Sequence, residues 1–202
     1  MLKQLGIAVA VLFLTTAALC QDNRFDVSVG ASYAINRQTS ANGIDQRPTD
    51  ETGLLGSIRY RFNPRSSFQF NYGHTKNAQE YTAAPFQYVV QSTVAEFTGA
   101  YVYNFARRGK FEPFMTAGGG VLVFTPGSTY VNTTLSGFGA QREDRTTFLY
   151  GAGLDYAVYK RLGLRVQYRG LLYSNPDFHV HSLFVGGLTH TAEPAIGVVF
   201  KF

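Results

Sequence analysis

Apolar residues occupy every second position at the end of the chain. Counting back from the terminal Phe202, these positions are Phe200, Val198 and Ile196, and a mixed set that begins with Lys201 lies between them. A period of two places alternate side chains on opposite faces of a β-strand. A terminal strand with an apolar face frays unless something covers it. Lipid around a closed β-barrel would provide that cover.

Seven earlier segments also resemble strands, and at least six of the eight segments alternate between apolar and polar residues with a period of two. The eight predicted strands are Arg24–Ala34, Gly53–Phe62, Ser67–Thr75, Gln91–Phe105, Phe111–Phe124, Thr147–Tyr159, Leu162–Tyr173 and a closing strand from about Thr191. In the fifth segment Phe111 and Met115 share one face, yet Phe114 and Phe124 have the opposite parity. The pattern therefore leaves the facing of this strand open.

The connections between these segments alternate between short and long. The short ones are Asn63–Ser66, Ala106–Lys110 and Lys160–Arg161, and the long ones are about Ile35–Thr52, Lys76–Val90, Thr125–Thr146 and Ser174–His190. Outer-membrane barrels have short periplasmic turns and longer extracellular loops. The sequence thus predicts an all-β fold, an eight-stranded antiparallel up-and-down transmembrane β-barrel, with four extracellular loops. We assign residues 21–202 to this single domain.

The first 20 residues have the pattern of a secretory signal peptide. Lys3 precedes an apolar stretch from Leu5 to Leu14, and small residues lead to Cys20, after which we expect cleavage. An uncleaved anchor is the first alternative, but the stretch is shorter than the roughly 20 residues of a spanning helix. A lipidated Cys20 is the second alternative, although Leu19 is not the small residue that such signals prefer.

Composition supports a membrane barrel and argues against two other classes. Aromatic residues make up 15% of the chain and charged residues only 15%, whereas about 25% charged is usual. The formal net charge is +5, but the longest basic run is the pair Arg107-Arg108, so we expect no nucleic-acid partner. Cys20 is the only cysteine, which leaves no disulfide in the mature chain. A secreted β-sandwich with an aromatic core remains an alternative.

Charged residues fall on the predicted inner faces and at the short turns. The predicted lumen charge network consists of Arg59, Arg61, Glu96, Asp155, Arg165, Arg169, Glu193 and Lys201. The interior of an eight-stranded barrel is just wide enough for side chains to fill it, so these charges should pair and plug it. An ion path is the alternative. The basic turn residues could contact anionic headgroups, or could be basic only because they are solvated.

Three sequence features resemble the small outer-membrane barrels related to the transmembrane part of outer membrane protein A. They are the terminal Phe200-Lys201-Phe202, the Phe111-Glu112-Pro113-Phe114 strand start and the Gly118-Gly119-Gly120 run. The resemblance implies a monomeric barrel in the outer membrane, in contact with lipid and lipopolysaccharide. It also implies that the barrel assembly machinery recognises a C-terminal assembly signal, here Ile196, Val198, Phe200 and Phe202.

Some barrels of this size modify lipid A, and a catalytic site of that kind would lie near the predicted outer rim. The candidates are His179, His181, Ser182, His190 and Glu193. A serine nucleophile needs a histidine base within reach, but adjacent residues of a strand, such as His181 and Ser182, point to opposite faces. We therefore predict no catalytic, metal or cofactor site. The expected function is a non-enzymatic envelope or surface-interaction role carried by the extracellular loops, with a lipid A-modifying enzyme and a narrow pore as alternatives.

Overall fold

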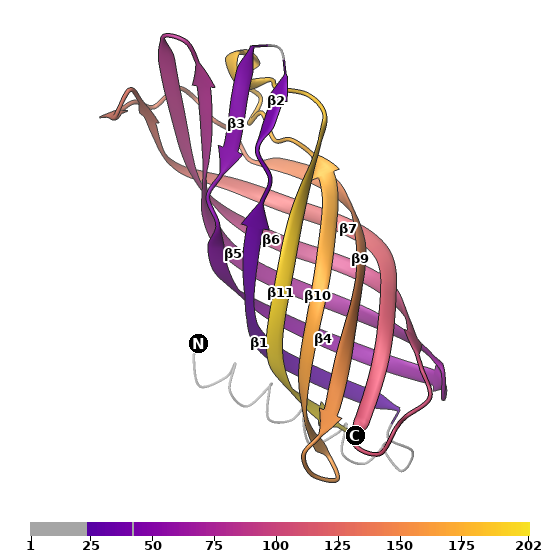
Figure 1. Ribbon diagram of the computed structural model, residues 1–202. Helices are drawn as coiled ribbons and strands as arrows, with labels where there is room; N and C mark the ends of the chain where they lie inside the picture. The colour runs from indigo at the N-terminus through magenta and orange to yellow at the C-terminus, as the bar shows by residue number, and fades with distance from the viewer. Residues whose placement is uncertain (1–23, 42) are drawn as a thin grey trace.

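The chain folds into a tilted barrel of long antiparallel strands (Figure 1). The computed structural model describes residues 24–41 and 43–202, so the predicted signal peptide at residues 1–20 lies outside the described residues. The barrel strands are β1 (Phe25–Asn36), β4 (Glu51–Asn63), β5 (Ser66–Ala83), β6 (Phe86–Asn104), β7 (Phe111–Val131), β9 (Glu143–Ala157), β10 (Leu162–Ser174) and β11 (Leu188–Lys201). Shorter elements are β2 (Thr39–Ala41), β3 (Ile44–Pro48), β8 (Thr134–Leu135) and the 3-10 turn η1 (His181–Leu183).

The sheet closes because the first and last strands pair with each other. β1 pairs with β4 on one side and with β11 on the other, and Val29 lies opposite both Gly56 and Val198. All neighbouring barrel strands are antiparallel, and each follows its neighbour in chain order. The predicted eight-stranded antiparallel barrel is confirmed.

The alternation of side chains sorts the barrel into an apolar outer belt and a filled interior. Outward residues such as Leu54 and Ile196 are 64% and 59% exposed, whereas their inward neighbours Leu55 and Ala195 are buried. Such an outer surface is stable against hydrocarbon. On β7, Met115 is exposed and lies outside, while Phe114 and Phe124 are buried inside.

Two lumen-facing glycines let β6 and β7 approach each other closely. A Cβ atom at Gly118 would lie 2.1 Å from the carbonyl oxygen of Gly99, and one at Gly120 would lie 2.0 Å from that of Phe97. Both distances are far below van der Waals contact, so any larger residue would force the two backbones apart. The Gly118-Gly119-Gly120 run therefore has a packing role in the barrel wall.

The predicted boundaries of three of the four long outer connections were wrong, whereas the fourth, about Ser174–His190, agrees with the end of β10 and the start of β11. The segment Lys76–Val90 is not a loop: β5 and β6 remain paired in one register from Ser66 opposite Tyr103 to Ala83 opposite Phe86. Above the belt the outward side chains become polar, which removes the alternation while the backbone pairing continues. Ile35–Thr52 likewise contains β2 and β3, and the segment Thr125–Thr146 contains the ends of β7 and β9 together with β8.

The longest strands extend beyond one end of the barrel. β3 pairs with the outer part of β5, with Asp45 opposite Thr82. It therefore continues the sheet beyond the extracellular end of β4. Figure 1 shows this projecting sheet at one end and the C-terminus at the other. Long extensions mark the extracellular end and short turns the periplasmic end. Among the described residues no helix is long and apolar enough to cross a membrane.

Candidate functional site: the filled lumen and its outer lid

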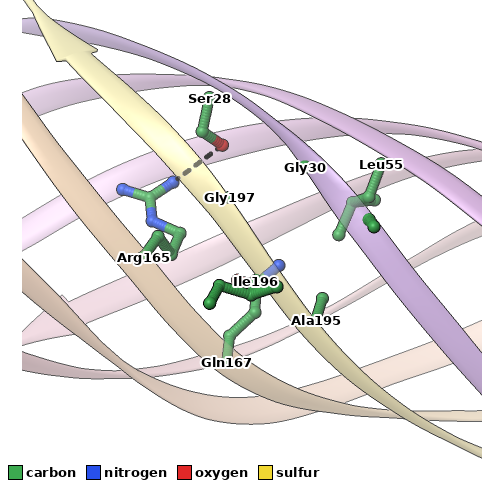
Figure 2. A pocket seen from close by; sticks show the side chains of 9 residues that line it. Ser28, Gly30, Leu55, Arg165, Gln167, Ala195, Ile196 and Gly197 are labelled. Carbon is green, nitrogen blue, oxygen red and sulfur yellow. Dashed lines mark hydrogen bonds between the residues drawn. The ribbon is translucent and has the colours of Figure 1, made fainter.

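Arg165 on β10 is the centre of a buried charge network in the periplasmic half of the lumen. Its Nε and Nη2 atoms donate to the Asp155 carboxylate at 2.7 and 2.9 Å, and Nη2 also donates to Asp26 Oδ1 at 3.1 Å. Nη1 lies 3.3 Å from the hydroxyls of Ser28 and Ser57. Figure 2 shows the Arg165 guanidinium pointing to the Ser28 hydroxyl. These contacts satisfy the charge in a site that excludes solvent.

Arg59 completes this layer from β4. Its Nη1 atom lies 3.4 Å from Asp155 Oδ2, and its Nε atom donates to Gln69 at 2.8 Å. The ring of Phe114 lies beside both guanidinium groups, 4.3 Å from Arg59 and 5.3 Å from Arg165. Cation–π contacts of this kind are stronger where water is absent, which explains an aromatic residue among charges.

A second cluster lies nearer the periplasmic opening. Glu112 on β7 accepts hydrogen bonds from Arg61 at 2.6 Å and from Lys201 at 3.0 Å. These three side chains come from β7, β4 and β11, so the cluster links distant parts of the wall. Arg61 and Lys201 belong to the set predicted from sequence. Glu112 was missed because the facing of its strand was left open.

Further toward the outer end, two glutamates share one arginine. Arg169 on β10 donates to Glu96 on β6 and lies 3.2 Å from Glu193 on β11. All three side chains are buried. A cavity of about 40 Å³ adjoins this group, and its lining includes both glutamates as well as Leu122 and Tyr173. The cavity has room for about three water molecules.

The outer half of the lumen contains an apolar cluster. Leu122 and Phe124 on β7, Leu149 on β9 and Leu171 on β10 form one buried cluster with side chains from the β10–β11 connection. The inner face is therefore charged in the periplasmic half, whereas the outer half combines this apolar cluster with buried polar residues such as Gln46 and Gln79. Together the two layers occupy the lumen across the membrane-spanning part of the barrel, where a small cavity of about 10 Å³ lies beside Gly30 and Leu55 (Figure 2).

The connection between β10 and β11, residues 175–187, folds inward over the extracellular mouth, and we call it the outer lid. Phe178, Leu183 and Val185 are the lid residues in the apolar cluster, and each is no more than 1% exposed. The ring of Phe178 meets that of Phe124 edge to face at 6.4 Å. Burying such a side chain stabilises the closed lid by about 1.5–3 kcal/mol.

Polar contacts fix the lid to the top of the wall. The carboxylate of Glu143 on β9 accepts the backbone N–H groups of Phe178 at 2.7 Å and Asp177 at 2.8 Å. Arg145 forms ion pairs with both Glu143 and Asp177. The Tyr81 hydroxyl on β5 donates to the carbonyl oxygen of Pro176 at 2.7 Å. The lid is therefore hydrogen-bonded to two strands on different sides of the mouth.

Burial changes the acidity of two of these groups. It raises the pKa of Glu143 above its ordinary value, although the Phe178 amide and the Arg145 charge act in the opposite direction. The pKa of Tyr81 is raised well above its ordinary value, first by burial and second by the nearby Glu143 charge. The Tyr81 hydroxyl thus remains a hydrogen-bond donor in the closed state.

The residues considered for catalysis do not come together. His181 and Ser182 lie exposed on η1, at the surface of the lid. His190 faces outward on β11, where its Nε2 atom lies 2.8 Å from the Tyr150 hydroxyl. Glu193 faces the lumen and contacts Arg169. Within residues 24–41 and 43–202 no group of histidine and acidic side chains is arranged to hold a metal ion.

Comparisons with known proteins agree with this architecture. A family model for the outer membrane protein beta-barrel domain matches residues 6–187. Similar solved structures include OprG from Pseudomonas aeruginosa, with 14% identity, a TM-score of 0.59 and coverage of 88% of this chain and 95% of that chain. Neisserial surface protein A has 21% identity, a TM-score of 0.54 and coverage of 88% and 97%. Ail from Yersinia pestis has 14% identity, a TM-score of 0.51 and coverage of 88% of this chain and 97% of that chain. A sequence search of curated proteins finds no match.

Proposed function

Because the chain belongs to the outer membrane protein β-barrel domain family and resides in the outer membrane, we propose that it is a closed, non-enzymatic barrel that acts through its extracellular surface. One observation carries this proposal. The lumen is filled by charged and apolar layers under a fixed lid, while β5, β6 and β7 continue outward as a paired sheet. The ordered surface available to a partner is therefore outside the membrane.

The extracellular surface has features that suit a protein partner. Its exposed apolar residues are Phe86 at 47%, Leu135 at 68%, Phe184 at 50% and Leu188 at 70%. Exposed apolar groups at the ends of an ordered sheet suit a protein contact.

The charge of this region disfavours a polyanion. Its charged residues are the basic Arg37, Arg47, Lys76, Arg142 and Arg145 and the acidic Asp45, Asp50, Glu51, Glu80, Glu143, Asp144 and Asp177. Ail from Yersinia pestis has been solved in complex with the heparin analogue sucrose octasulfate. An acidic excess here supports a different kind of ligand.

Contacts with the membrane and with the assembly machinery are part of the same proposal. His74 and Lys76 follow the last outward aromatic residue of β5, Tyr72, and so lie at the height where lipopolysaccharide headgroups are expected. On β11 the outward Ile196, Val198 and Phe200, followed by the terminal Phe202, form the surface that the assembly machinery would bind. We propose that the inserted barrel is a monomer.

The proposal is tested in cells that lack the chain, cells complemented with it, and cells carrying a Phe86→Ser, Leu135→Ser double variant. We expect the wild-type chain to restore both attachment to protein-coated glass and exclusion of a hydrophobic dye. The double variant should lose attachment while keeping the dye excluded, because both side chains are outside the barrel wall. Unchanged attachment and dye uptake on removing the whole chain would contradict the proposal.

A lipid A-modifying activity makes a different prediction. Mass spectrometry should show the same lipid A acyl composition in cells that carry the wild-type chain and the Ser182→Ala variant. An acyl-chain change that depends on Ser182 would replace the non-enzymatic function with an enzymatic one.

A further inference from the structure

The periplasmic turns carry a concentration of unpaired positive charge. Six exposed basic residues lie on the three short turns, and we call them the basic collar: Arg65, Arg107, Arg108, Lys110, Lys160 and Arg161. The turns contain no acidic residue. None of the six forms an ion pair with any residue that the structure describes.

Positive charge is not concentrated in this way elsewhere on the barrel. The lumen contains five basic residues (Arg59, Arg61, Arg165, Arg169 and Lys201) and five acidic ones (Asp26, Glu96, Glu112, Asp155 and Glu193). The extracellular end has the acidic excess described above. The excess of positive side-chain charge among the described residues is therefore found at the periplasmic end.

The basic collar lies directly beside the lipid-facing belt. Lys110 and Arg161 are each followed in sequence by an outward apolar residue of the belt, Phe111 at 48% exposure and Leu162 at 41%. The ammonium group of Lys110 lies 5.9 Å from the ring centre of Tyr156. The three turns join β4 to β5, β6 to β7 and β9 to β10, so they are spread around the barrel end and do not form one face (Figure 1).

We infer that the basic collar binds the headgroups of anionic phospholipids in the periplasmic leaflet. Tight turns keep each positive charge within a Debye length, about 8 Å, of the headgroup plane. A ring of charges next to aromatic belt residues matches a lipid annulus, whereas a protein partner or cell-wall polymer would approach one face. The chemistry recognised is a phosphate-bearing headgroup with net negative charge.

The chain contains no tryptophan, so a single introduced tryptophan reports on its own lipid neighbours. Tyr159 is 75% exposed next to Lys160 and Arg161, which makes Tyr159→Trp a reporter for the collar. Tyr33→Trp, at a position 45% exposed near the other rim, is the matched control. Each protein is folded into vesicles of equal parts phosphatidylglycerol and phosphatidylcholine, with one lipid brominated at a time to quench the fluorescence.

At low salt, brominated phosphatidylglycerol should quench the Tyr159→Trp reporter as if it were enriched about fivefold over brominated phosphatidylcholine. Fivefold is the least enrichment expected, because a single basic residue near a charged surface contributes about 1 kcal/mol, and the reporter lies next to two such residues. The ratio should fall toward one in high salt, and also when Lys160→Gln and Arg161→Gln are added to the reporter. The Tyr33→Trp control should show no such preference.

Equal quenching by the two lipids at the Tyr159→Trp reporter in low salt would overturn the inference. An equal preference at both rims would also overturn it, since the collar would then not be the cause. Heat-modifiable migration on a gel verifies that each variant is folded. If the glutamine variant does not fold, the salt dependence of the Tyr159→Trp reporter decides the question alone.

Discussion

Replacing Arg165 by methionine removes the centre of the lumen network and leaves its acidic partners buried. Asp155 would lose two hydrogen bonds, at 2.7 and 2.9 Å, and Asp26 one at 3.1 Å. Arg165 is 2% exposed, so water cannot replace these contacts without entering the barrel. The Arg165→Met substitution should therefore be among the most destabilising in the protein.

The magnitude follows from the contacts that remain. Removing one partner of a buried ion pair typically costs about 3–5 kcal/mol, because the other charge stays buried. Here Arg59 remains 3.4 Å from Asp155, which moves the expected loss toward the lower end, about 3 kcal/mol. In an Asp155→Asn, Arg165→Met double variant, the coupling energy between the two sites should be about 1–3 kcal/mol.

Urea titration of the barrel folded into vesicles, read as the fraction with heat-modifiable migration, measures this loss. Arg37→Met, at an exposed position between β1 and β2, is the control and should change the free energy of unfolding by no more than about 0.5 kcal/mol. If Arg165→Met destabilises the barrel by less than about 1 kcal/mol, or no more than the control does, then the network does not hold the lumen together.

Three further perturbations test the lid and the barrel wall. Glu143→Ala removes the acceptor of two hydrogen bonds from lid amides, and each bond contributes about 1.5 kcal/mol. The hydrogens of those amides should therefore exchange with solvent roughly a hundredfold faster. Asp144→Asn, at an exposed position, is the control and should leave their exchange rates unchanged. Because the folded pKa of Tyr81 is raised, the folded state keeps a proton that the unfolded state loses above about pH 10. In urea titrations above that pH, the stability of the wild type should therefore fall relative to that of Tyr81→Phe by up to about 1.4 kcal/mol per pH unit. Parallel stability curves for the two proteins would contradict this expectation. Gly118→Ala places a Cβ atom 2.1 Å from a backbone oxygen and should reduce the fraction that folds, as seen by gel migration, whereas at Gly127 the nearest atom is 3.5 Å away and Gly127→Ala should fold normally.

Much of the barrel could be predicted because its lipid-facing side follows one rule, which is that every second residue of a strand is apolar. Outside the membrane that rule no longer applies, so the outer halves of β5 and β6 were mistaken for a loop. Their backbone pairing, from Lys76 opposite Thr93 onward, does not depend on apolar outward residues. The lengths of these strands therefore could not be read from hydrophobic alternation.

The interior was harder to predict because inward residues are charged in one layer of the lumen and apolar in another. Phe114 lies among charges and Phe124 lies in an apolar cluster, so neither fits a uniformly polar lumen. Their position on β7 obscured its facing and hid Glu112 from the predicted network. The inward fold of the lid depends on long-range contacts such as Glu143 with Phe178, which no local pattern reveals.

Planar-bilayer recording of the purified protein tests the filled lumen most directly. The stacked charge network, apolar cluster and lid predict a quiet bilayer in both the wild-type protein and the Glu143→Ala variant, since the lower network remains when the lid is loosened. Stable, resolved current steps from the folded wild-type barrel would show an open path through the interior and contradict the account.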